Sequence, residues 1–213
     1  MRVLTVGTDC ALGKKYTALA LTKALQEAGR AATFRATGQT GIMISGSGVA
    51  IDAVVADFIA GAAEWLSPNN KPDHWDVIEG QGALFHPAYA GVTLGLVHGS
   101  QPDALVLCHD PLRTTIDEYP HCPLPTLREA MDQYLTAARI TNRAVRFVGI
   151  SLNTSKLTDE HRKRLTVELE KEFKLPVIDP IREGAARIAA RMVQNFPGSA
   201  ASASPATPAR APS

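Results

Sequence analysis

VLTVGTDCALGK, residues 3–14, opens the chain with an apolar run and a loop bounded by Gly7 and Gly13. Lys14 closes the loop and begins a run rich in Ala and Leu that has helical character. A strand, a glycine-bounded loop ending in Gly-Lys and a helix together bind phosphate, because loop amides and the helix N-terminus donate hydrogen bonds and the lysine supplies charge. We therefore expect a ligand that carries a di- or triphosphate to bind here.

The loop departs from the common P-loop pattern in two respects. Five residues, instead of four, separate its two glycines, and Lys15 stands where a Ser or Thr hydroxyl usually ligates magnesium. A bound magnesium ion would need its oxygen from Thr17 one turn further on, from Thr8 or Asp9 in the loop, or from an acid elsewhere in the chain. A packing turn without any ligand is the alternative interpretation.

Composition indicates one ordinary soluble domain. The chain has 213 residues, of which 45% are hydrophobic and 20% are charged, and its net charge is +1. So small a charge gives no field that would recruit nucleic acid, and no apolar stretch is long enough to span a bilayer. The first residues lack the features of a signal peptide, so we expect a cytoplasmic protein.

The three cysteines form neither a metal-binding pair nor an even disulfide framework, which favours a reducing compartment. Cys10 stands out because it lies in the phosphate loop. A thiol at a helix N-terminus can have a lowered pKa and act as a nucleophile. The simpler interpretation, a small residue that fits a tight loop, is favoured.

Apolar strand-like runs alternate with helical stretches along the chain. Strands this short and apolar are usually covered on both faces, so we expect an α/β fold: a three-layer sandwich with a mostly parallel sheet, like that of P-loop NTPases. The predicted domain is 1–196, followed by a disordered Ala/Ser/Pro-rich tail, 197–213. The expected strands are 2–6, 32–36, 76–79, 104–108, 145–152 and 177–178, and the expected helices are 15–28, 49–65, 92–98, 126–141, 158–173 and 184–195.

Ligands in such sheets bind beyond the carboxyl ends of the strands. Glu79 follows the third predicted strand and, with Asp9, is a candidate for holding magnesium, whereas Asp76 at the strand start is expected to be structural. His86 in the same loop is a candidate general base. His109 also ends a strand. The alternatives are a solvated turn for Glu79 and surface hydrogen bonding for the histidines.

Segment 37–41 and the serine-glycine run after it are rich in glycine and hydroxyl groups, whose amides can wrap an anion or a carboxylate. Asn153 ends a strand, and its side chain can both donate to and accept from a purine base, although turn chemistry explains it equally well. The candidate substrate-binding residues are Arg35, Thr37, Gln39 and Gln81.

Three motifs carry a resemblance: GTDCALGK (7–14), EGQGALFHP (79–87) and GVTLGLVHG (91–99). Together with the strand that ends in Asn153, they resemble the dethiobiotin synthetase and cobyrinate-amidase branch of P-loop proteins. They are more similar to a P-loop family that includes bacterial D-glutamate N-acetyltransferase. The resemblance covers about residues 1–195. It implies a dimeric cytoplasmic enzyme that acts on a D-amino acid, and an additional N-terminal α/β domain, here absent or supplied by a separate polypeptide.

The favoured hypothesis is acetyl transfer from acetyl-CoA, whose pyrophosphate the loop would hold without magnesium. In it His86 or Glu79 takes a proton from the substrate amine, and loop amides stabilise the thioester oxyanion. The runner-up is ATP-Mg²⁺-dependent phosphorylation of a carboxylate, with Asp9 and Glu79 at the metal and Lys14 stabilising charge. A non-catalytic nucleotide-binding module is the third. The expected donor-binding residues are Gly7, Thr8, Asp9, Cys10, Ala11, Leu12, Gly13, Lys14, Lys15, Thr17 and Asn153.

Overall fold

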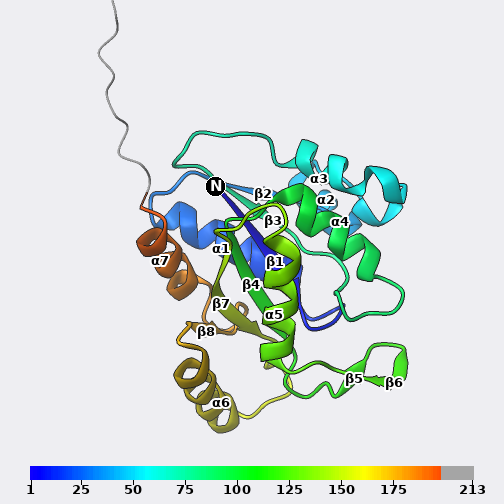
Figure 1. Cartoon of the computed structure of the whole chain (residues 1–213). Coiled ribbons are helices and arrows are strands. Elements are labelled where there is room, and N and C mark those ends of the chain that lie inside the picture. The colour runs from blue at the N-terminus through cyan, green and yellow to red at the C-terminus, as the bar shows by residue number, and fades with distance from the viewer. Residues whose placement is uncertain (198–213) are drawn as a thin grey trace, which may run out of the picture.

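A computed structural model describes residues 1–197 and shows a parallel six-stranded sheet between two layers of helices, as predicted (Figure 1). The strand order is β2-β3-β1-β4-β7-β8, and every neighbouring pair in this sheet is parallel. The predicted tail lies outside the described residues, apart from Pro197. The strands are β1 (Arg2–Gly7), β2 (Ala32–Arg35), β3 (Trp75–Ile78), β4 (Ala104–His109), β7 (Arg146–Leu152) and β8 (Val177–Ile178).

The strands are apolar on both faces because each face packs against helices. Leu4 and Val6 of β1 belong to one buried cluster, whereas Val3 points to the other side and belongs to a second one. This alternation follows from the two-residue period of a strand. The first cluster includes side chains of α3 (Ile59–Leu66), α4 (Ala90–Ser100) and α5 (Leu127–Ala138), and partly buried side chains of α6 (Asp159–Phe173) pack against it. The second cluster includes side chains of α1 (Lys14–Glu27) and α7 (Ala186–Asn195).

The predicted helix 49–65 is wrong. This stretch forms two short 3-10 turns, η1 (Ile51–Ala53) and η2 (Ala56–Phe58), and only then α3. The backbone amides of Val49 and Ile51 donate to the carbonyl oxygens of Ala36 and Thr37, so the chain follows the end of β2 instead of coiling. The nearby β-branched residues also have a low helix propensity.

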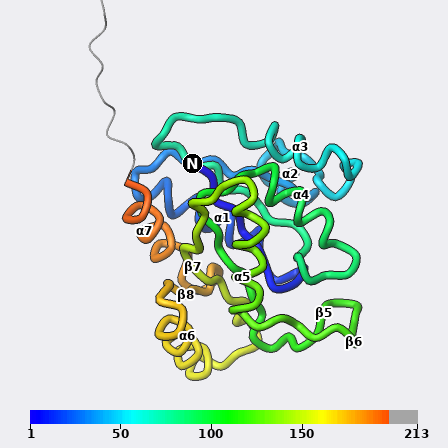
Figure 2. The backbone as a smooth tube through the Cα atoms, viewed as in Figure 1, coloured from blue at the N-terminus to red at the C-terminus, as the bar shows by residue number. Residues whose placement is uncertain are grey.

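Two further elements were not predicted. Helix α2 (Gln39–Ser45) lies within the segment interpreted as a loop. An antiparallel hairpin, β5 (Thr115–Ile116) and β6 (Tyr119–Pro123), follows β4. In Figure 2 this hairpin lies beside the loop that follows β1, and hydrogen bonds between the two segments agree with the view. The hairpin therefore forms one wall of the region where function was predicted.

The sheet register brings the segments after the central strands to a common edge. Leu4 pairs with Ile78 of β3, and Gly7 pairs with Cys108 of β4. The loops that follow β1 and β4 therefore start at similar levels, whereas the loop after β3 starts beside Leu4 and runs past Thr5 toward the same edge.

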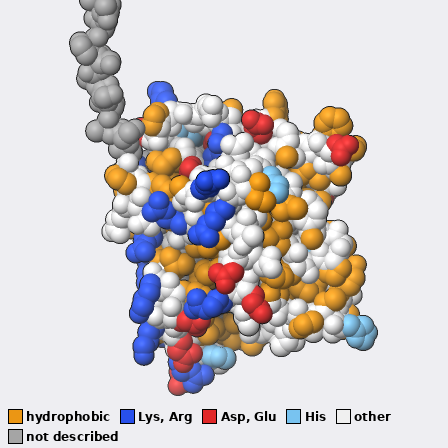
Figure 3. Space-filling view, viewed as in Figure 1, with side chains coloured by type: hydrophobic (Ala, Val, Ile, Leu, Met, Phe, Trp, Pro, Cys, Tyr) orange, Lys and Arg blue, Asp and Glu red, His pale blue; other side chains and the backbone are white. Residues whose placement is uncertain are grey.

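Charged and apolar side chains occupy different parts of the surface. Lys and Arg side chains gather on the side of α6 and α7 in Figure 3, whereas apolar side chains are frequent on the side of α3 and α4. None of the helices described in residues 1–197 is both long and apolar enough to cross a membrane. The large apolar residues exposed on α2, η2, α3 and their connections are Met43, Ile44, Val55, Phe58 and Trp65.

Candidate functional site

The loop between β1 and α1 has the form of a phosphate cradle. Gly13 adopts a left-handed conformation with a φ of 101°, and α1 begins directly after it at Lys14. The Lys14 ammonium group crosses the loop and donates to the carbonyl oxygen of Asp9 at 2.7 Å. Burial lowers the pKa of Lys14. A buried cation beside a helix N-terminus is the combination that a ligand's phosphates require.

Asp9 organises the loop from within. Its side chain is fully buried, and one carboxylate oxygen accepts the backbone N–H of Cys10 at 2.7 Å. The other oxygen accepts from the guanidinium of Arg113 at 2.7 Å and from the backbone N–H of Asp117 at 2.8 Å. Residues from the β4–β6 region therefore neutralise and hold the only acidic side chain of the loop.

The oxygen atoms considered as magnesium ligands are already engaged. The Thr17 hydroxyl lies 3.1 Å from the carbonyl oxygen of Gly13 and 2.8 Å from the Ser151 hydroxyl. The Thr8 hydroxyl lies 2.9 Å from Nδ1 of His109. Asp9 is held by Arg113, so in this arrangement its carboxylate is not free to ligate magnesium.

Glu79 follows β3 and faces the amino end of α2. One of its carboxylate oxygens accepts the backbone N–H groups of Thr37 at 3.0 Å and Gly38 at 3.2 Å. Gly41 makes this approach possible, because a Cβ there would lie 2.1 Å from the same oxygen. Burial raises the pKa of Glu79, and the two amides act in the opposite direction. The amides that we expected to wrap a substrate anion thus bind the protein's own carboxylate.

Two cavities meet at the phosphate loop. The smaller, of about 250 Å³, lies between residues 10–16 and residues 79–82. The other, of about 400 Å³, extends from the loop to the ends of β7 and β8 and is lined by Asn153. The Asn153 amide oxygen accepts the backbone N–H of Ser155 at 3.3 Å, as in a turn, and this orients the side chain at the cavity wall. A further hollow of about 470 Å³ between β6 and α5 contains no residue of the loop.

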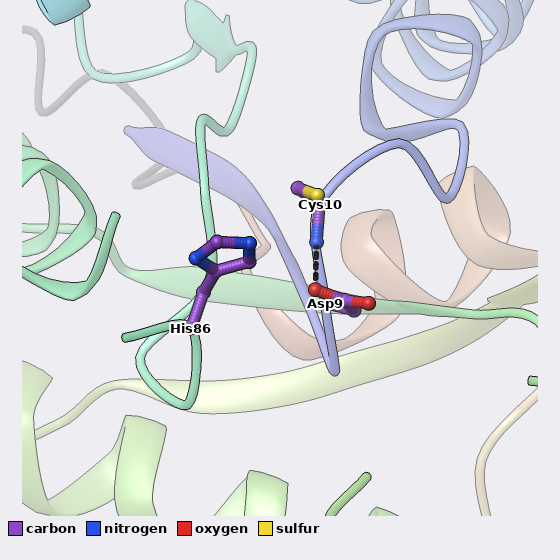
Figure 4. Close-up of side chains that lie close together, drawn as sticks. All are labelled: Asp9, Cys10 and His86. Carbon is purple, nitrogen blue, oxygen red and sulfur yellow. Dashed lines mark hydrogen bonds between the residues drawn. The ribbon is translucent and has the colours of Figure 1, made fainter. Parts of the chain in front are cut away.

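His86 is buried beside the loop, and its exposed fraction is 1%. Its ring stacks on Tyr89, with 4.2 Å between centroids, and meets the edge of Tyr119 at 5.2 Å. Its Nδ1 accepts the backbone N–H of Ala88 at 3.2 Å. Its Nε2 has no hydrogen-bond partner in the described part of the chain. The imidazole ring faces Cys10 (Figure 4).

Asp9, Cys10 and His86 bring potential ligand atoms within 4.8 Å of one another. A histidine that ligates a metal through one nitrogen usually donates the other N–H to an acceptor. The Nδ1 of His86 instead accepts from Ala88, so this ring does not fit metal ligation through Nε2. Burial, with the charges of Asp9 and Asp117, raises the pKa of Cys10 to about 11. The thiol is therefore protonated at neutral pH and has no activated nucleophile character.

The structure separates the four predicted substrate-binding residues. Gln81 lines the smaller cavity, whereas Thr37 is buried against Glu79 and Gln39 is exposed on α2. The Arg35 guanidinium pairs with Asp76 at 2.7 Å. Because Asp76 lies level with Thr33, this side chain runs back from the carboxyl edge of the sheet, and Asp76 has the structural role that was expected.

Sequence reasoning missed two residues that shape the loop. Arg113 holds Asp9 and also donates to the carbonyl oxygen of Cys10 at 2.9 Å. Tyr134 of α5 donates its hydroxyl to the carbonyl oxygen of Gly7 at 2.8 Å and accepts the backbone N–H of Leu84 at 3.2 Å. Burial raises the pKa of Tyr134. Both residues are distant from the loop in sequence, so no local pattern could reveal them.

The chain belongs to the DUF1611 family, since the model of its C-terminal P-loop domain, a domain of unknown function, matches residues 1–189. A curated relative from Tritonibacter scottomollicae, named D-glutamate N-acetyltransferase, is 53% identical over 187 residues. The match covers 88% of this chain and 56% of the relative, so the chain spans little more than half of that protein. A second curated relative, from a Pseudoalteromonas species, has the same name and is also 53% identical, with 90% of this chain and 58% of the relative covered.

Solved structures agree with this assignment. A crystal structure of a DUF1611 family protein from Anabaena variabilis is 43% identical, has a TM-score of 0.84 and covers 91% of this chain and 57% of its own length. Cobyrinic acid a,c-diamide synthase from Mycobacterium smegmatis, solved with ADP and magnesium, has a TM-score of 0.51 at 12% identity, with 91% and 92% coverage. The second similarity shows the P-loop NTPase-like fold alone.

Proposed function

We propose that this member of the DUF1611 family binds acetyl-CoA at its phosphate loop and transfers the acetyl group to the amino group of a D-amino acid such as D-glutamate. The observation that carries the proposal is the loop itself. Lys14 and the amino end of α1 offer charge and amides to a pyrophosphate, while the one carboxylate of the loop is held by Arg113. The curated relatives named D-glutamate N-acetyltransferase support the choice of reaction.

Acetyl-CoA fits the two cavities by its chemistry. Its pyrophosphate would lie at residues 7–14, where Lys14 and Lys15 supply positive charge without a metal ion. Its adenine would enter the larger cavity, beside Asn153. The thioester would then extend toward the smaller cavity, which lies between the loop and Glu79.

Glu79 is the proposed general base. A carboxyl group whose pKa is raised by burial is better matched to proton transfer near neutral pH than an exposed one. The amine nitrogen attacks the thioester carbon, the C–N bond forms, and Glu79 takes the amine proton. The C–S bond then breaks and coenzyme A leaves as the thiolate, which takes up a proton. Backbone amides of the loop stabilise the oxyanion in between.

ATP-dependent activation of a carboxylate is the second candidate function. The fold similarity to a synthase solved with ADP and magnesium favours it. Glu79 has one carboxylate oxygen that does not accept the amides of α2, and this oxygen could ligate the metal. Asp9 would first have to leave Arg113. A nucleotide-binding module without turnover is the third candidate.

We further propose that the protein acts in the cytoplasm as a homodimer. The curated relatives are longer than this chain, which covers 56% and 58% of them. A separate domain, corresponding to the part of those relatives outside the match, would then complete the substrate pocket.

The reaction is tested by mixing the protein with acetyl-CoA and D-glutamate and following the release of free thiol. L-glutamate is the matched control for the acceptor, and ATP-Mg²⁺ with ADP detection tests the runner-up. Thermal shift runs in parallel, because a true donor raises the melting temperature in a concentration-dependent way. Binding without product would support the non-catalytic module, and the absence of both would contradict all three candidates.

Lysine substitutions test where the pyrophosphate of acetyl-CoA binds. Lys14→Met should weaken acetyl-CoA binding about 100-fold, because the ligand's phosphates would lose a buried charge. Lys15→Met should have a smaller effect, because Lys15 is partly exposed and lies over the ring of Tyr16. Equal losses in the two variants would contradict the proposed position of the pyrophosphate.

A further inference from the structure

We propose that His86 is a catalytic hydrogen-bond donor to the acyl oxygen of the thioester, and that it is not the general base. The inference rests on the proposed acetyl transfer and assigns one of its roles. If His86 is a donor, Glu79 alone accepts the proton of the substrate amine.

The hydrogen bond from Ala88 fixes where the imidazole carries its proton. Nδ1 accepts a backbone N–H at 3.2 Å, so its lone pair is occupied and it bears no proton in the neutral ring. The proton of neutral His86 is then on Nε2. A general base needs a free lone pair at the nitrogen that faces the substrate. Nε2 offers an N–H group instead.

The ring is held in this orientation from several sides. Tyr89 stacks on one face and Tyr119 packs edge-on, so a flip would have to displace aromatic neighbours as well as the Ala88 hydrogen bond. The free Nε2 is nevertheless buried and has no partner in the described residues. Buried donors in proteins are nearly always paired. An unpaired one beside a ligand cradle indicates that an acceptor atom of the ligand completes it.

The position of the ring identifies that acceptor. His86 has a ring nitrogen within 4.8 Å of the Cys10 thiol, and Cys10 lines the smaller cavity (Figure 4). An oxygen that entered beside Cys10 would meet the Nε2–H group. The negative charge of Asp9 at this place is compensated by Arg113, whose guanidinium lies 2.7 Å away. The Nε2–H group of His86 is therefore already oriented to donate to the acyl oxygen as negative charge develops on it in the tetrahedral intermediate.

The first test compares two substitutions at position 86. His86→Gln keeps an N–H group near the position of Nε2 but cannot act as a base, whereas His86→Ala removes the donor. We expect the Gln variant to keep kcat within about 10-fold of the unmodified protein, with the same acidic limb in its pH profile. The Ala variant should lose about 100- to 1000-fold in kcat. Equal losses in both variants, or a lost acidic limb in the Gln variant, would overturn the inference.

His98 supplies a matched control. It is another histidine whose Nε2 has no partner in the described residues, but it lies on α4 and is not part of the Asp9 and Cys10 cluster. His98→Ala should leave kcat unchanged. A loss like that of His86→Ala would show that filling buried space, and not donation, explains the effect.

A second test needs no turnover and uses the unmodified protein. In ¹⁵N-labelled protein we expect the His86 signals to report a proton on Nε2, and this signal to move on addition of acetyl-CoA but not of CoA, which lacks the acyl oxygen. A proton on Nδ1, or identical shifts with both ligands, would contradict the role of His86 alone. Failure of both ligands to bind would instead contradict the proposed function, and the inference with it.

Discussion

The two loops that face each other across the site are held in different ways. The loop after β1 combines local and remote contacts: Asp9 accepts from Cys10 and Lys14 donates back to Asp9, while Arg113 holds the Asp9 carboxylate from a distant segment. The loop after β3 depends on remote groups. Glu79 is held by Thr37 and Gly80 by Thr5, 42 and 75 residues away. Contacts between residues close in sequence leave a motif that can be recognised in the sequence. Contacts between distant residues can be recognised only once the fold is known.

The largest effect is expected where the β3 loop touches β1. Gly80→Ala would place a Cβ 1.7 Å from the carbonyl oxygen of Thr5, which is backbone and cannot rotate away. We expect a loss of about 4 kcal/mol or more in the free energy of unfolding, measured by urea denaturation. Gly91→Ala is the matched control, because a Cβ there meets nothing within 4 Å and lies in α4. Similar stabilities for the two variants would show that the β3 loop is not tied to β1 as described.

The next effect concerns a remote contact of the β1 loop, the ion pair between Arg113 and Asp9. Arg113→Ala would leave the Asp9 carboxylate buried without its cation, and we expect a loss of about 3 kcal/mol in unfolding free energy. A double-mutant cycle checks the cause. The cost of Arg113→Ala should fall markedly when Asp9 is already Asn, because no buried charge is then left unpaired. An unchanged cost in the Asp9→Asn background would mean that Arg113 stabilises the protein through other contacts.

Tyr134 joins the two loops, so its substitution tests both at once. Tyr134→Phe would leave the carbonyl oxygen of Gly7 and the N–H of Leu84 without this hydroxyl partner. We expect a loss of about 2 kcal/mol, again in urea denaturation, and faster amide hydrogen exchange at Leu84. Tyr16→Phe should change stability little, since Tyr16 is 52% exposed. Unaltered exchange at Leu84 would argue against the link.

The smallest effect is a pH dependence at the β1 loop. Burial lowers the pKa of His109 from 6.5 to about 4, and its Nδ1 lies next to the Thr8 hydroxyl. Between these values the unfolded chain binds the proton and the folded chain does not, so stability falls as the pH drops from about 7 to 4. We expect His109 to account for about 1 kcal/mol of the loss between about pH 7 and about pH 5.5. His109→Asn should flatten the curve by this amount, and an identical slope would contradict the assignment.

The sequence predicted the sheet, most helices and the phosphate loop, because alternating apolar runs and a Gly-Lys turn are local signals. It failed at 49–65, where hydrogen bonds to the end of β2 override an apparently helical pattern. It also missed the β5–β6 hairpin, because β5 has only two residues and β6 contains two prolines, which argue against a strand. At the site, Glu79 and His86 were recognised by type and position, but the groups that hold them were not. Arg35 was predicted to bind the substrate because it is charged and lies near the end of a strand. The sequence did not reveal its ion pair with Asp76.

The buried ammonium group of Lys14 would couple the binding of a phosphate-bearing ligand to the uptake of a proton. Its pKa is lowered by burial in the loop, and a bound pyrophosphate would restore the preference for the charged form. Association should therefore draw protons from the buffer wherever the lysine is partly neutral beforehand. Calorimetric heats would then depend on the ionisation enthalpy of the buffer, and the loop would act as a proton-linked switch as well as a receptor.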